Sequence, residues 1–471
     1  MGRFESLYAR LPVLAQHGAV SAYGVYWHWL RFGPGYASYV KEYAEREWLS
    51  AEGWQAWQRK ELGDLLQAAT TRVPYYQRAW GKQDKAAARA GRLEELPLLE
   101  KDPIRADPNE FLRQDMRPWP QFISHTSGST GTPITCKWTV GEYRNTRALR
   151  EVRSARWAGV SFSMPRATFS GRLVEPKPES KGPFYRFNVA ERQVYFSPFH
   201  LRPDTASFYV DALRRHRVQW MTGYAVSYYL LAKFILEQGL EVPPLKAIIT
   251  TSEKVTPEMR RVMESAYGCR VYEEYSSVEN ALFASECEQG RLHISPDVAV
   301  VEILRPDGTP CRPNEEGEVV ATCLMRRYQP FIRYRLGDVA MWDDEQCPCG
   351  RLMPVLKEVV GRIEDVVVGP DGRQMVRFHG IFVAQPHVRE GQIIQEALDR
   401  IRVKVVSTNG FGASDFQDIV HRVQQRLGPQ VEVIVEPVSQ IPRTSAGKFQ
   451  AVISLLGKSG VLEDERMGIH S

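Results

Sequence analysis

The chain has 471 residues, of which 43% are hydrophobic and 25% charged, and its formal net charge is +5 at pH 7. This length exceeds one ordinary hydrophobic core, so we expect at least two domains, and so mild a charge gives no case for nucleic-acid binding. No apolar run is long enough to span a bilayer and the N-terminus lacks the apolar stretch of a signal peptide, so a cytoplasmic protein is expected.

Residues 1–115 are predicted to form a helical region rich in aromatic side chains. Apolar residues recur at helical spacing over residues 54–69, and Val73-Pro74 marks the end of that helix. The clustered tryptophans are first interpreted as packing anchors. An exposed part of this region that touches a membrane surface or a partner is the alternative.

Residues 116–361 are predicted to form a core domain in which strands and helices alternate. Strands are predicted at residues 219–224, 245–250 and 270–272. One helix at 226–238 separates the first two strands, and a second helix, which begins at Pro257 with Thr256 as its cap, separates the last two. This alternation indicates parallel strands with crossover helices. Residues 298–304 and 317–323 read instead as antiparallel strands, because the turn Pro306-Asp307-Gly308 follows the first of them.

Residues 362–471 are predicted to be a separate small domain. A strand at 403–406, a helix at 415–427 and a strand at 431–435 make a compact α+β unit. The expected fold class is therefore α/β, with a large N-terminal domain of parallel sheets plus a β-barrel-like region, and a small α+β domain at the C-terminus.

The segment from Ser124 to Pro133 is a loop rich in Ser, Thr, Gly and Pro that follows residues 121–123, which read as the end of a strand. Gly128 and Gly131 allow positive φ, so that consecutive N–H groups can converge on a phosphate. The loop lacks the Gly-Lys-Ser/Thr of a Walker motif, and a solvated surface loop explains the composition equally well.

Four further segments follow this loop in a characteristic order. They are Tyr275-Ser276-Ser277-Val278-Glu279, Arg333-Tyr334-Arg335-Leu336-Gly337-Asp338, Gly361-Arg362-Ile363-Glu364-Asp365 and Pro442-Arg443-Thr444-Ser445-Ala446-Gly447-Lys448. Together with the loop, this series resembles the signature motifs of the adenylate-forming superfamily. The phenylacetate–CoA ligase branch of this superfamily is resembled by three shorter segments: Glu286-Cys287, Gly290-Arg291-Leu292-His293-Ile294 and Cys347-Pro348-Cys349-Gly350-Arg351. Its CapK-like members are resembled by Val73-Pro74-Tyr75-Tyr76.

The resemblance implies an AMP-forming ligase that needs ATP and Mg²⁺. A carboxylate would attack the α-phosphate of ATP to give an acyl-AMP, and the acyl group would then pass to coenzyme A. An amine acceptor, as in amidation of a polysaccharide or secondary metabolite, is one alternative, and adenylyl transfer to a deazaflavin-type coenzyme is another. A non-catalytic ATP-sensing protein would not need the complete set of motifs. Whether the chain forms a homodimer is left open.

The resemblance also assigns roles to single residues. Lys448 would be the catalytic cation, and Glu279 would hold Mg²⁺ against the phosphates. Glu364 and Asp365 would form the hinge about which the small domain rotates. The remaining nucleotide contacts would come from the phosphate loop, the adenine-stacking tyrosine, the ribose-binding aspartate and an arginine near the hinge: Thr126, Ser127, Gly128, Ser129, Thr130, Gly131, Tyr275, Asp338 and Arg362.

Two departures from the superfamily pattern stand out. Ile134 occupies the position after Pro133 where a lysine is common, and Leu336 replaces the usual threonine before Gly337-Asp338. The first departure also marks the phenylacetate–CoA ligase branch. The second removes a hydroxyl near the nucleotide but leaves Asp338.

Cys287, His293, Cys347 and Cys349 are candidate ligands of a structural Zn²⁺. Three thiolates and one imidazole complete a tetrahedral shell, although Cys-x-Cys is tighter than the usual Cys-x₂-Cys spacing. Reduced buried cysteines are the alternative.

The acid itself is not readable from the sequence. Its pocket is expected near residues 222–224 and 250–253, beyond the ends of two predicted strands. Nearby aromatic residues, Trp220 and Phe169 among them, would suit a ring but equally suit a core. Arg166, Arg172 and Lys177 would suit an anionic or sugar substrate, and a solvated charged loop explains them as well.

Overall fold

The computed structural model describes most of the chain in full. Side chains of residues 3–6, 362 and 374–375 are not described. The described residues are 3–125, 134–170, 174–175, 177, 180–362, 367–370, 374–375, 381–382, 385, 387–442 and 449–456.

The chain divides into two compact units. Unit 1 comprises Met1–Leu336 and Ala340–Val359, and unit 2 comprises Gly337–Val339 and Val360–Ser471. Each unit has a hydrophobic core of its own.

Unit 1 begins with a series of helices, as the sequence predicts. Ser50 caps the predicted tryptophan-rich helix, because its Oγ accepts a hydrogen bond from the Gly53 N–H at 3.1 Å. Among the described residues, none of the helices is both long and apolar enough to cross a membrane. The helices are α1 (Arg3–Arg10), α2 (Val13–Phe32), α3 (Tyr36–Arg46), α4 (Ala51–Arg72), α5 (Pro74–Ala79), α6 (Lys82–Arg89) and α7 (Lys101–Ala106).

The central feature of unit 1 is a mixed sheet, which has 12 strands within the described residues. The antiparallel strands that we expected to form a barrel-like region are hydrogen-bonded into this same sheet. In spatial order the strands are β11 (Ala299–Leu304), β12 (Gly317–Cys323), β13 (Tyr334–Trp342), β14 (Val355–Arg362), β10 (Leu292–Ile294), β9 (Phe283–Glu286), β8 (Arg270–Ser276), β7 (Ala247–Thr251), β6 (Trp220–Tyr224), β3 (Arg166–Phe169), β5 (Gln193–Phe196) and β4 (Tyr185–Asn188).

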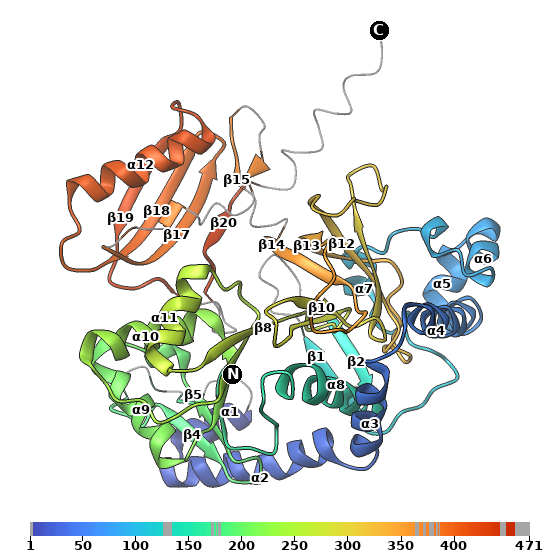
Figure 1. Ribbon diagram of the computed structural model, residues 1–471, viewed down its shortest axis with the longest axis horizontal. Coiled ribbons are helices and arrows are strands. Elements are labelled where there is room, and N and C mark those ends of the chain that lie inside the picture. Colours follow the sequence, from blue (N-terminus) through green and yellow to red (C-terminus); the bar gives the residue numbers. More distant parts are fainter. Residues whose placement is uncertain are drawn as a thin grey trace. The chain divides into compact units, whose positions relative to one another are not determined.

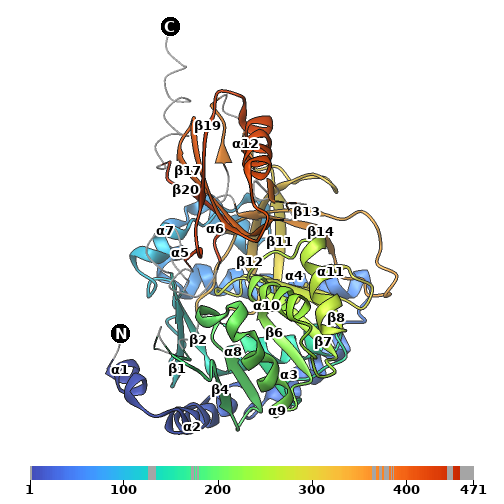
Figure 2. The same ribbon diagram turned by 90° about the vertical axis from the view of Figure 1, so that its left-hand side faces the viewer.

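The half of the sheet from β5 to β8 is parallel, which confirms the predicted alternation. Its crossover helices are α9 (Ala206–Arg215), α10 (Ala225–Gln238) and α11 (Pro257–Tyr267), and α10 and α11 lie side by side in both views (Figures 1 and 2). Thr256 caps α11 as predicted: its Oγ1 accepts from the Met259 N–H at 3.2 Å. One core lies between these helices and the strands.

A separate hairpin carries the predicted phosphate loop. Strands β1 (Gln121–His125) and β2 (Thr135–Thr139) pair antiparallel, and His125 lies opposite Thr135 at the open end. Helix α8 (Val140–Arg150) follows directly. It begins with a capping box in which Thr139 Oγ1 accepts from the Glu142 N–H at 3.0 Å and Glu142 Oε2 accepts from the Thr139 N–H at 2.7 Å.

Unit 2 is a small sheet covered by one described helix. Its strands run in the order β19 (Glu432–Pro437), β18 (Arg400–Ser407), β17 (Val388–Ala397) and β20 (Val452–Ser454), and the two-residue strands β15 (Val367–Val368) and β16 (Gln374–Met375) pair separately. Helix α12 (Ala413–Leu427) lies along this sheet (Figure 1) and buries Ile419, Val423 and Leu427 against it.

A buried ion cluster joins three distant parts of unit 1. Asp297, just before β11, accepts hydrogen bonds from Arg153 and from Arg46 of α3. The side chains of Asp297 and Arg153 are both completely buried. Burial alone would raise the pKa of Asp297, but the two guanidinium groups outweigh it and lower that pKa below its usual value.

We expect Asp297→Asn to lower the free energy of unfolding of unit 1 by about 3–5 kcal/mol, because it leaves Arg153 buried without its charge partner. A carboxyl group with a lowered pKa stabilises the fold above its unfolded pKa of about 4, and this stabilisation is lost as the pH falls through the folded pKa. In urea titrations, the free energy of unfolding of the variant should therefore be lower than that of wild type at neutral pH, and this difference should disappear in acid. The control is Asp64→Asn, which removes one partner of an exposed ion pair with Lys60 and should change the free energy of unfolding little. An equally small effect of Asp297→Asn would contradict this account of the cluster.

Candidate active site

The carboxyl ends of β6, β7 and β8 lie next to one another at one edge of the parallel half. Tyr224 pairs with Thr251, and Thr251 pairs with Glu274. Residues 252–253 and 277–280 therefore leave the sheet at the same edge, which is where ligands bind in open α/β sheets. Ser252 has a φ of 71°, in the left-handed region that side chains other than glycine rarely adopt. Such strain is typical of functional loops.

The structure shows the surroundings of several residues whose contact with a substrate the sequence left open. Trp220 and Phe169 are completely buried in hydrophobic clusters, so neither is placed to contact a substrate ring. Arg166 is buried as well, and its Nη2 donates to Glu191 Oε2 at 2.6 Å and Gln193 Oε1 at 2.7 Å. Its guanidinium is thus occupied inside the protein. Lys177 is exposed, and Arg172 lies outside the described residues.

Gly223 and Glu253 also have structural roles in the expected acid pocket. A Cβ at Gly223 would lie 2.0 Å from the Phe169 carbonyl oxygen, so only glycine lets β6 approach β3 this closely. Glu253 Oε2 accepts from the Val226 N–H at 2.8 Å and so caps the first turn of α10. These two positions shape the edge of the sheet.

Glu279 follows β8 and is almost completely buried. Its Oε1 accepts a hydrogen bond from the Tyr334 hydroxyl at 2.8 Å, and Tyr334 is itself completely buried on β13. Burial, followed by the negative charge of Glu279, raises the pKa of Tyr334 far above its usual value. The phenol therefore remains a donor at every physiological pH and holds the carboxylate in one orientation.

Arg326 links Glu279 to the hairpin that carries the predicted phosphate loop. Its Nη1 donates to the Glu279 carbonyl at 3.0 Å and its Nη2 donates to the Lys137 carbonyl of β2 at 3.4 Å. The guanidinium also stacks on Trp138, with 3.8 Å between Cζ and the ring centroid. One buried cation thus fixes the distance between the hairpin and the Glu279 segment.

The other predicted nucleotide contacts are described to different extents. Tyr275 lies on β8 and is partly buried against the core, and Asp338 is buried on β13. Arg362 is the last residue of β14, and its side chain is not described. The predicted phosphate contacts Thr126–Gly131, the hinge residues Glu364 and Asp365, and Lys448 lie outside the described residues. Their roles stay predictions.

The four predicted zinc ligands come together in unit 1. Cys287 follows β9, His293 lies on β10, and Cys347 and Cys349 lie in the connection from β13 to β14. Their ligand atoms are all within 4.8 Å of one another. Cys287 Sγ is 3.6 Å from Cys347 Sγ, and Cys349 Sγ is 3.4 Å from His293 Nε2. A tetrahedral Zn²⁺ with bonds of about 2.3 Å to sulfur would separate two thiolates by a similar distance.

The surroundings of this cluster suit metal binding. His293 Nδ1 donates to the Met353 carbonyl at 3.2 Å, which leaves the Nε2 lone pair directed toward Cys349. Burial lowers the pKa of His293 to about 4, so the imidazole is neutral at pH 7. The Gln289 N–H donates to Cys287 Sγ at 3.3 Å, and the Trp157 ring packs edge-on against His293. The donor set therefore fits a soft divalent cation.

Tyr334 and Arg326 are the site residues that sequence reasoning missed. Tyr334 stands inside one of the recognised motifs, but nothing in its spacing shows that it faces Glu279, 55 residues earlier. Arg326 stands outside every motif, and its contacts with Glu279 and Lys137 depend on how distant strands pack.

With this geometry established, comparison with known proteins defines the class of protein. A crystal structure of 2-hydroxyisobutyryl-CoA ligase in the postadenylation state, in complex with R3-HIB-AMP, is similar over 86% of this chain and 90% of that chain. The TM-score is 0.66 and the sequence identity is 21%. The chain therefore has the fold of an adenylate-forming CoA ligase, as the sequence predicted.

The sequence comparisons are more specific. Residues 369–455 match the family model of the CapK C-terminal domain. Protein CapK of Staphylococcus aureus is 25% identical over 383 residues, which cover 77% of this chain and 80% of that protein. The phenylacetate-coenzyme A ligase of Thermus thermophilus is 24% identical over 463 residues, covering 87% and 98% of the two chains. The chain is a homologue of CapK and of the phenylacetate–CoA ligases, which confirms the predicted resemblance.

We expect a double-mutant cycle of Tyr334→Phe and Glu279→Ala to give a coupling energy of about 0.5–3 kcal/mol in the free energy of unfolding, because the two side chains share a buried hydrogen bond. Denaturant titration of the four proteins measures it. Tyr209→Phe, which removes a buried hydroxyl bonded to the Ser197 carbonyl, is the matched control and should combine additively with Glu279→Ala. Additivity for Tyr334 as well would show that the hydroxyl does not hold Glu279.

Proposed function

We propose that this protein adenylates a carboxylic acid with ATP and transfers the acyl group to coenzyme A. The observation that carries this proposal is the buried Glu279 side chain at the carboxyl edge of the parallel strands, where Tyr334 donates to its carboxylate and Arg326 holds its backbone carbonyl. The fold shared with a ligase that was crystallised with an acyl-AMP, and the homology to phenylacetate–CoA ligases, support the same chemistry.

The reaction would proceed in two displacements. A carboxylate oxygen of the acid attacks the α-phosphorus of ATP, and pyrophosphate leaves. The thiol of coenzyme A then attacks the acyl carbon, loses its proton and displaces AMP. The first step brings anions together, so it needs cations and preorganised donors.

The residues of this chain divide that work. Glu279 would be the oxygen ligand for Mg²⁺, which would neutralise phosphate charge when bound. Lys448, by its motif, supplies the cation at the reacting oxygens, and Thr126–Gly131 supply N–H donors to the phosphates. Tyr275, Asp338 and Arg362 contact the nucleoside. The small domain rotates about Glu364 and Asp365 between the two steps.

Acid-dependent exchange of pyrophosphate into ATP tests the first step, because exchange needs no acceptor. With pooled aryl, aliphatic and uronic acids we expect exchange that requires Mg²⁺ and falls by about 10²-fold or more in Glu279→Gln and in Lys448→Ala. Lys404→Ala, on β18 of unit 2, is the control and should keep full exchange.

Other outcomes of the same assay point elsewhere. Exchange that is unaffected by Glu279→Gln would overturn the role of that residue. Absence of exchange in protein that binds ATP would favour adenylyl transfer to a non-carboxylate, such as a deazaflavin-type coenzyme, and a stable AMP-bearing product would identify it. Once an acid is known, product formation with coenzyme A or with amines identifies the acceptor.

We further propose that Cys287, His293, Cys347 and Cys349 bind a structural Zn²⁺. The support is the cluster of four ligand atoms and the hydrogen bond that fixes the tautomer of His293. A metal here would tie the end of β9 and strand β10 to the connection between β13 and β14.

We expect protein purified without chelator to contain one zinc per chain, and Cys349→Ser to lower both the zinc content and the thermal stability. Elemental analysis and thermal unfolding measure the two effects. Cys311→Ser, a partly exposed cysteine outside the cluster, is the control. Zinc-free protein in which all four groups react freely with a thiol or imidazole reagent would contradict the proposal.

A further inference from the structure

Helix α2 carries an unusual sequence for an exposed helix. Residues 11–30 contain no Asp, Glu, Lys or Arg, although Arg10 precedes them and Arg31 follows. The helix has 20 residues and so is about 30 Å long. In both views it runs along the outer edge of unit 1 (Figures 1 and 2). An uncharged surface of this length needs an explanation, because helices on protein surfaces normally carry a polar outer face.

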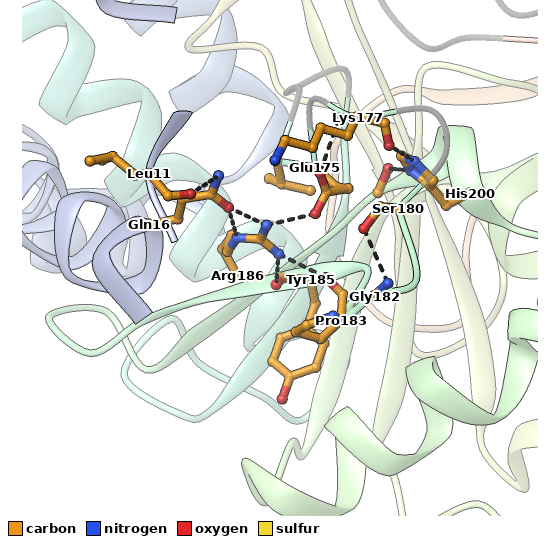
Figure 3. Close-up of polar contacts among 12 residues, drawn as sticks. Leu11, Gln16, Glu175, Lys177, Ser180, Gly182, Pro183, Tyr185, Arg186 and His200 are labelled. Carbon is orange, nitrogen blue, oxygen red and sulfur yellow. Dashed lines mark hydrogen bonds and ion pairs between the residues drawn. The ribbon is translucent and has the colours of Figure 1, made fainter. Parts of the chain in front are cut away.

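The inner face of α2 is held firmly by a buried arginine. Gln16 Oε1 accepts from Arg186 Nε at 2.7 Å, and Arg186 Nη2 donates to Glu175 Oε2 at 2.8 Å (Figure 3). Arg186 is completely buried on β4. Its other donors reach the carbonyls of Pro183 and Tyr185, both at 2.7 Å.

Further contacts extend this attachment along the helix. His17 Nδ1 accepts from the Phe187 N–H at 2.9 Å, and Ser21 Oγ donates to the Phe187 carbonyl at 3.2 Å. A Cβ at Gly24 would lie 2.0 Å from Asn188 Oδ1, so the helix packs directly on β4 at this point. Because β4 fixes the inner face, the outer face has one defined orientation.

The outer face is apolar and aromatic. Leu14 is 86% exposed, Val25 63% and Trp29 45%. Tyr23 and Tyr26 are also exposed, and their rings stack with centroids 5.9 Å apart. Gly18 and Ala22 are exposed between Leu14 and Val25. Together these residues form a continuous strip without charge, which we call the α2 strip.

Several exposed arginines lie on segments that adjoin α2 in the chain or next to β4. Arg10 is exposed just before the helix, and Arg192 is exposed in the turn after β4. Arg215 and Arg217 are exposed on either side of His216, whose ring stacks on Phe187. Glu191, which contacts Arg31 of α2, is buried and paired with Arg31 and Arg166.

We propose that the α2 strip binds the surface of an anionic lipid bilayer. Tyrosine and tryptophan combine an apolar body with a polar tip and favour the interface between lipid and water. An exposed apolar helix face with cations beside it is typical of a helix that lies in the plane of the membrane surface. The charge complementarity with acidic headgroups favours lipid over a second copy of the chain, which would bring like charges together.

Sedimentation of the full-length protein with vesicles tests this proposal. We expect wild type to pellet with vesicles of equal parts phosphatidylcholine and phosphatidylglycerol, to bind phosphatidylcholine alone more weakly, and to be released by salt. Leu14→Glu combined with Val25→Glu should weaken binding to the anionic vesicles by about tenfold or more, since both side chains would have to enter the interface.

The control is Leu236→Glu with Leu398→Glu, which adds the same charge at two exposed leucines outside α2 and should bind like wild type. Far-UV circular dichroism checks folding, and Leu14→Ser with Val25→Ser replaces the test variant if the latter does not fold. Wild type that stays in the supernatant, or α2 variants that bind as tightly as wild type, would overturn the proposal. A lipid-independent dimer that the α2 variant dissociates would show that a second copy covers the strip instead.

Discussion

The buried carboxylate of Glu279 is the constraint on which the candidate site depends. A carboxylate in the protein interior is stable only when hydrogen bonds and charge replace water. Here Tyr334 donates to the Glu279 carboxylate, and Arg326 donates to the backbone carbonyl of Glu279. Because Arg326 also holds Lys137 of β2, the Glu279 segment, β13 and the hairpin of the predicted phosphate loop form one assembly. The side chain that would bind the metal is thus oriented before any substrate arrives, which is what electrostatic catalysis requires.

Other buried polar groups in unit 1 fix the frame around this assembly. Asp297 joins α3, the segment after α8 and the strand β11, and Gly223 allows β6 to approach β3. The cysteine–histidine cluster joins the strands on the other side of β8. Each of these contacts links residues far apart in the chain. Elements on either flank of β6, β7 and β8 are therefore fixed by long-range contacts.

Much of the fold was predictable because it is local. Sequence patterns located α4, α10, α11 and α12: the helical spacing of apolar residues indicated α4, and Thr256 marked the start of α11 through its cap. The motif order also predicted the protein class, and the three cysteines with His293 suggested the metal cluster, although the Cys-x-Cys spacing is tighter than usual. Long-range packing was not predictable: β3 lies between β5 and β6, Trp220 and Phe169 are in the core, and Tyr334 and Arg326 reach Glu279 only after distant strands have paired. Periodicity shows that a residue is buried but not which residue it faces.

The transfer of oxygen from the acid to AMP tests the central claim most directly. The acid is supplied with both carboxylate oxygens labelled as ¹⁸O, and the AMP formed in a complete reaction with the acceptor is analysed by mass spectrometry. If the carboxylate attacks the α-phosphorus and the acceptor then displaces AMP, each AMP carries one labelled oxygen. AMP without label, from a reaction that consumes the acid, would contradict acyl-adenylate formation by this protein.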